Sequence, residues 1–213
     1  MHRCLATAHD ALTNIEGAHR VHGWNTPLRV ANLSVVVRQP APSRLTVPMV
    51  VFNAIGEPTP YVHDVVSAAV ASTGYWEVAD LHTLATAAGL SSLPPPSRGV
   101  VLDIGAGVGT YSIAFASLGY RVVAIEPMTQ NTLALAATAC LNTSGSGDRI
   151  RVLRSAVVGP AHASSTRTTC AVLSAWKADD FGNGQLECSN KSGAHGCDRR
   201  HNGMLIRANF VRS

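Results

Sequence analysis

The residues best placed to do chemistry are in the string DIGAGVG at 103–109, where an acidic residue stands two positions before three alternating glycines. An apolar, β-branched run precedes the string and a stretch of helical character follows it. A strand that turns sharply into a helix leaves backbone N–H groups free beside the positive end of the helix dipole. Glycines there let the chain turn and let a ligand approach with no Cβ in the way. The pattern predicts a ligand-binding loop.

A second acidic residue, Glu126, ends the next apolar run, YRVVAIE, 21 residues after Gly105. An acidic side chain at this spacing can accept hydrogen bonds from both hydroxyls of a ribose. We therefore expect the ligand of the loop to contain a ribose.

The glycine spacing distinguishes between two ribose-bearing cofactors. Nicotinamide dinucleotides bind to G-x-G-x-x-G, whereas here the glycines fall as G-x-G-x-G and Thr110 stands where the third glycine should be. Asp103 would repel a diphosphate, but its charge would favour the sulfonium and amino groups of S-adenosylmethionine. The sequence therefore predicts S-adenosylmethionine as the cofactor and disfavours a nicotinamide-dependent reductase.

Residues 101–109 resemble the first motif of S-adenosylmethionine-dependent methyltransferases, (V/L)-D-(I/L)-G-x-G-x-G. The longer string VVLDIGAGVGTYSIAFASLGYRVVAIEPM is similar to the FkbM-type methyltransferases, which read D-x-G-A-x-x-G and then V-x-A-x-E-P. The resemblance covers residues 99–158 strictly and 61–188 generously. It implies a class I methyltransferase with an α/β fold, a Rossmann-like doubly wound parallel sheet. The implied activity is O-methyl transfer to a hydroxyl of a small molecule or a sugar.

The resemblance also implies roles for individual residues, with the loop surrounding the methionyl part of the cofactor and the later acidic residue binding its ribose. The implied cofactor-binding residues are Asp103, Gly105, Ala106, Gly107, Gly109 and Glu126. Family members continue with a fourth strand often reading K-x-D-x-E-G, but KADD at 177–180 lacks the apolar run and the Glu-Gly. In this fold the cofactor lies in a crevice between the first and fourth strands. Without the fourth strand as one wall of that crevice, the sequence predicts a truncated or divergent domain, and it identifies no general base. The alternative is a non-catalytic remnant that acts through protein contacts.

Apolar periodicity and proline positions predict four segments. Residues 1–60 contain six prolines and form an irregular lead-in with short strands. Residues 61–98 form a helical preface, with Asp64 and Gly74 capping a first helix, a second helix over 76–88 and a Pro-rich linker at 91–98. Residues 99–188 form a partial methyltransferase domain, and residues 189–213 a poorly ordered tail.

Within the third segment, the sequence predicts three parallel strands, over 99–104, 120–126 and 149–158, joined by helices over about 108–118 and 127–141. The first of these strands is continuously apolar, and we expect it to be buried on both faces. Beyond residue 159 no further apolar run is flanked by a helix of matching length, so no additional strand is predicted.

Composition limits the partners. The excess positive charge lies wholly after residue 188, in a cluster too sparse and too poor in aromatic residues to predict nucleic-acid binding. No apolar run approaches the ~20 residues of a membrane span, and the N-terminus does not resemble a signal peptide. Five cysteines, an odd count without a tight repeat, favour a reducing compartment. We therefore expect a cytoplasmic protein whose partner is a small-molecule methyl acceptor.

A metal site is not expected. Four suitable zinc ligands lie close together near the C-terminus, but their spacing, C-x6-H-x-C-x3-H, matches no standard site. These residues are Cys188, His195, Cys197 and His201.

Overall fold

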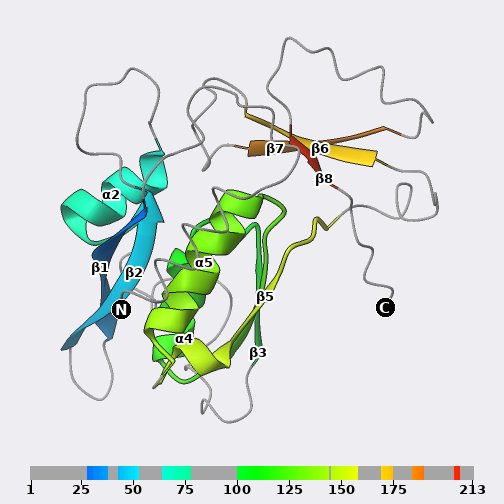
Figure 1. Cartoon of the computed structure of the whole chain (residues 1–213). Coiled ribbons are helices and arrows are strands. Elements are labelled where there is room, and N and C mark those ends of the chain that lie inside the picture. The colour runs from blue at the N-terminus through cyan, green and yellow to red at the C-terminus, as the bar shows by residue number, and fades with distance from the viewer. Residues whose placement is uncertain are drawn as a thin grey trace.

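The computed structural model describes residues 28–37, 43–52, 64–77, 100–143, 145–157, 169–174, 184–189 and 204–206. They form an α/β structure with a three-stranded parallel sheet, three α-helices and two antiparallel sheets (Figure 1). The elements are β1 (Leu28–Val37), β2 (Ser43–Phe52), α2 (Val65–Thr73), β3 (Val100–Ile104), α4 (Thr110–Ser117), β4 (Arg121–Ile125), α5 (Thr129–Leu141), the 3-10 helix η1 (Gly147–Arg149), β5 (Ile150–Leu153), β6 (Thr169–Ser174), β7 (Gly184–Ser189) and β8 (Met204–Ile206).

The parallel sheet has the strand order β3-β4-β5 and contains the segment that could do chemistry. Its strands alternate with α4 and α5, which confirms the predicted succession of three parallel strands and two connecting helices. The third strand is shorter than predicted, because β5 ends at Leu153.

Both connecting helices lie on the same face of this sheet, between it and the β1–β2 hairpin (Figure 1). One apolar core joins the three layers, with Val50 of β2, Ile113 of α4 and Val122 of β4 all at most 1% exposed. The lead-in, for which short strands were predicted, thus contains two strands of ten residues each. The apolar side chains of this hairpin pack on the outer side of α4 and α5 and remove it from water.

Helical side chains satisfy the edge of β2 that faces away from β1. The Thr138 hydroxyl of α5 accepts a hydrogen bond from the Val50 N–H at 2.9 Å, and the Ser67 hydroxyl of α2 accepts one from the Phe52 N–H at 3.0 Å. A strand edge with unpaired N–H groups would otherwise be buried at a cost in free energy. These contacts attach the hairpin to the helices.

The first predicted helix, with both of its caps, is confirmed as α2. The Asp64 carboxylate accepts a hydrogen bond from the Ser67 N–H at 2.8 Å, and Gly74 ends the helix in the left-handed conformation at φ 78°. Asp64 is only 1% exposed, so its cap lies in the interior.

We predict that Asp64→Ala lowers the free energy of unfolding by about 1–2 kcal/mol, because the Ser67 N–H loses its acceptor in a buried position. Urea denaturation followed by circular dichroism measures the loss. Asp64→Asn is the matched control, since its amide oxygen still accepts the bond. Equal losses in both variants would show that the carboxylate acts through its charge and not as a cap.

The prediction that the first parallel strand is buried on both faces is wrong. Val100, Leu102 and Ile104 are 57, 57 and 56% exposed, whereas Val101 packs against the core. The reason is tertiary: α4 and α5 pack on the opposite face of the sheet, the one to which Val101 points (Figure 1).

A second antiparallel sheet, with the order β7-β6-β8, follows the parallel one. The sequence analysis did not predict these strands, because it sought strands that alternate with helices. Strand β8 falls within the predicted tail. Most of that tail, the helix predicted over 76–88 from residue 78 onward, and the Pro-rich linker at 91–98 lie outside the described residues.

In the part of the chain that the structure describes, no helix is long and apolar enough to cross a membrane. Cys140 is disulfide-bonded, which the odd number of cysteines did not predict.

Candidate cofactor-binding site

The loop between β3 and α4 folds back over the end of β4. The N–H groups of Gly105 and Ala106 both donate to the Ile125 carbonyl, at 2.8 and 3.1 Å. Gly105 and Gly107 have φ values of 77° and 55°, in the left-handed region that favours glycine. The loop is therefore held by backbone contacts at the carboxyl ends of two neighbouring parallel strands, where ligands of open α/β sheets bind.

Two of the three glycines border open space. A Cβ on Gly105 or on Gly107 would have no heavy atom within 4 Å, and Gly105 is itself exposed. Gly109 differs, because a Cβ there would collide with the side chain of Leu135 on α5. The structure thus leaves room for a ligand over Gly105 and Gly107, whereas Gly109 allows close packing of α4 and α5.

The Asp103 carboxylate supports the start of α4. It accepts a hydrogen bond from the Ser112 hydroxyl at 2.6 Å and another from the Ser112 N–H. The N-cap residue of α4, Gly109, has no side chain, so Asp103 supplies from the strand the acceptor that a capping side chain would give. Burial raises the pKa of Asp103, and the bonds from Ser112 oppose this increase.

Glu126 lies at the end of β4 and is only 4% exposed. Its carboxylate accepts hydrogen bonds from the Gly107 N–H and the Met128 N–H, both at 2.8 Å, and from the Asn131 amide at 3.4 Å. Glu126 therefore connects the glycine loop to the first turn of α5. A carboxylate has about four acceptor positions, and three are occupied, so one remains for a ligand hydroxyl. A second becomes free if the long contact with Asn131 opens.

Asp103 lies close enough to Glu126 for its charge to act on that carboxylate. Burial raises the pKa of Glu126, and the charge of Asp103 raises it further. Among the described residues, no cationic side chain compensates either group. A positively charged ligand near the loop would thus meet negative charge that no cationic side chain of the described segments neutralises.

These raised pKa values predict a pH effect on stability. A carboxyl group whose pKa is higher in the folded than in the unfolded state stabilises the fold fully below its ordinary pKa of ~4. This contribution is lost as the pH rises through the higher, folded-state pKa. Between the ordinary pKa of the carboxyl group and its higher, folded-state pKa, the free energy of unfolding of Asp103→Asn, relative to wild type, should therefore increase with pH. Above the folded-state pKa it should level off. Urea denaturation between pH 4 and pH 8 measures it, and a difference that stays constant with pH would contradict the assignment.

The structure brings all the predicted site residues together at the ends of β3 and β4: Asp103, Gly105, Ala106, Gly107, Gly109 and Glu126. Sequence analysis did not identify Ser112 and Asn131, which hold the two carboxylates. Gln130, on the first turn of α5, is 3% exposed, and its amide nitrogen and oxygen have no hydrogen-bond partner among the described residues; the sequence did not single it out. No spacing rule predicted these three, because each follows from how α4 and α5 pack on the strands.

The predicted crevice would lie between β3 and a further strand on the side of β3 away from β4. Among the described residues, no strand pairs with β3 on the side away from β4. The segment KADD at 177–180 lies outside the described residues. The described residues therefore include the β3 side of the predicted crevice and no strand for its other side.

We compared the chain with models of protein families, with curated proteins and with solved structures, and none of them matches it.

Proposed function

We propose that the chain binds S-adenosylmethionine at the β3–α4 loop and belongs to an O-methyltransferase that acts on a hydroxyl of a small molecule or sugar. One observation carries the proposal: two carboxylates, Asp103 and Glu126, that no cationic side chain among the described residues compensates, adjoin a glycine loop that borders open space at Gly105 and Gly107. Negative charge next to room for a ligand favours a cation and disfavours a diphosphate.

The residues present fit the proposed cofactor. Glu126 has acceptor capacity for a ribose hydroxyl, and Gly105 and Gly107 permit close approach of the methionyl part without a Cβ. Bound there, the cofactor would supply an electrophilic methyl group. The protein's contribution would be to orient the cofactor and an acceptor hydroxyl in line with that methyl and to exclude water. A Rossmann-like class I arrangement is part of this proposal.

Isothermal titration of the full chain with S-adenosylmethionine tests the proposal. We expect binding that strengthens as the pH rises through the raised carboxyl pKa values, since the ionised groups attract the cation. NAD should give no heat of binding. Binding of NAD but not S-adenosylmethionine would favour the nicotinamide reading, and the absence of binding by either would refute cofactor binding.

The structure also gives a specific reason to retain a second candidate, a non-catalytic remnant of the fold. Asp103 and Glu126 already have structural tasks, capping α4 and holding the loop, that require no cofactor. In the described residues β3 is also an edge strand, so the wall that would hold a methyl acceptor is not seen. This candidate predicts no response to S-adenosylmethionine and a function that depends on protein contacts.

A further inference from the structure

The parallel sheet has a face that α4 and α5 do not cover. Side chains alternate along β3, so Val100, Leu102 and Ile104 all point to this side, and each is more than half exposed. Parallel sheets are usually covered on both faces, because the helices that connect their strands pack on them. Three large apolar side chains in a row therefore indicate a surface that binds something.

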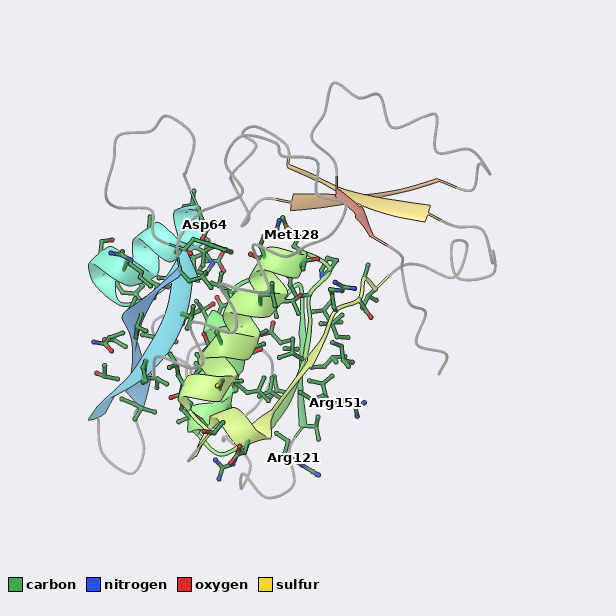
Figure 2. All side chains as sticks on the ribbon, in the orientation of Figure 1. Asp64, Arg121, Met128 and Arg151 are labelled. Carbon is green, nitrogen blue, oxygen red and sulfur yellow. The ribbon has the colours of Figure 1, made fainter. Side chains whose placement is uncertain are left out.

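Two arginines border this apolar row. The strand register places Arg121 of β4 beside Val100, and it places Arg151 of β5 in the row that runs from Leu102 through Val123. Both arginines are exposed, and Figure 2 shows their side chains on the side of the sheet away from α5. We call the side chains of Val100, Leu102, Ile104, Arg121, Val123 and Arg151 the open face.

The charge of the open face limits what can cover it. Its rows of paired residues contain two arginines and no acidic residue. A second copy stacked on the same surface would bring four arginines together out of water, at a high electrostatic cost. A strand added to the edge of β3 would leave the row exposed, since strand side chains stand roughly perpendicular to the sheet.

We propose that the open face is a docking surface for an acidic amphipathic helix of another protein. The apolar stripe of that helix packs on Val100, Leu102 and Ile104, and its flanking carboxylates pair with Arg121 and Arg151. Five residues of strand extend about 13 Å, which two to three turns of helix would match. The apolar contact supplies most of the affinity, and the arginines select the charge of the partner.

Two synthetic 18-residue peptides test the proposal by fluorescence anisotropy with the full chain. Both carry leucines at i, i+3, i+4 and i+7, but the flanking positions are glutamate in one and lysine in the other. We expect the acidic peptide to bind at least ~10-fold more tightly, and the ratio to shrink as salt screens the charges. Equal affinities, tighter binding of the basic peptide, or no binding of either peptide would overturn the proposal.

A charge-reversal variant sharpens the test. In the double variant Arg121→Glu with Arg151→Glu, the basic peptide should bind more tightly than the acidic one. Arg154→Glu is the matched control, because Arg154 is exposed but follows β5 and is outside the open face, and it should change the ratio less than ~3-fold. Circular dichroism verifies that each variant is folded. An unchanged preference in the double variant would refute the assigned surface.

Sedimentation velocity of the chain without peptide examines the competing occupant. We expect a monomer at concentrations where the acidic peptide binds. A dimer that Leu102→Glu disrupts would show that a second copy covers the open face, and it would overturn the proposal.

Discussion

Replacing Glu126 with alanine should weaken the binding of S-adenosylmethionine by roughly 10- to 100-fold and also destabilise the fold. The variant removes the acceptor proposed for the ribose, and it leaves the part-buried Gly107 N–H and the buried Met128 N–H without their partner. Lost hydrogen bonds to a charged group cost about 1.5–3 kcal/mol, which corresponds to roughly a 10- to 100-fold weaker affinity. The free energy of unfolding should fall by a similar amount for each N–H group that loses its partner.

The conservative variant Glu126→Gln separates these effects. Its amide oxygen can still accept one backbone N–H, so it should recover part of the stability, but it lacks the negative charge that attracts the sulfonium. We therefore expect Glu126→Gln to be more stable than Glu126→Ala and still at least ~10-fold impaired in cofactor binding. Thermal unfolding and titration calorimetry on the same samples measure both quantities. Wild-type affinity in Glu126→Gln would show that the charge of this residue does not attract the cofactor.

The second large effect is expected for Gly109→Ala, which should lower the free energy of unfolding by about 2–5 kcal/mol. The backbone of Gly109 has φ 93°, where an L side chain is strained, and the added Cβ would collide with Leu135. Leu135 is fully buried against the sheet, so a shift of its side chain would disturb its packing with Ala106 and Ala124. Urea denaturation measures the loss.

Two comparisons test the cause. Gly105→Ala has a similar φ of 77° but adds its Cβ in open space, so it should lose only about 1–2 kcal/mol. Leu135→Ala is itself destabilising because it leaves a cavity, but its combination with Gly109→Ala should cost less than the sum of the two single changes. Strict additivity in this double-mutant cycle would mean that the collision with Leu135 is not what makes glycine necessary at position 109.

Much of the local structure around the candidate site could be predicted from residue types and spacing. Asp64 and Gly74 bound α2 as predicted, because a cap depends on a side chain within a few residues of the helix end. The glycines of the loop and the apolar runs beside them predicted the β3, α4 and β4 succession for the same reason. These features depend on contacts between near neighbours in the chain, so the order of the amino acids determines them.

Other features depend on packing between elements that are distant in the sequence. Val100, Leu102 and Ile104 are as apolar as a fully buried strand, yet only the packing of α4 and α5 on the opposite face of the sheet decided that they are exposed. The pairing of Ser112 with Asp103 and the contact between Gly109 and Leu135 arise where α4 and α5 meet the strands. Periodicity identifies which side of an element is apolar, but only the folded chain determines what that side contacts.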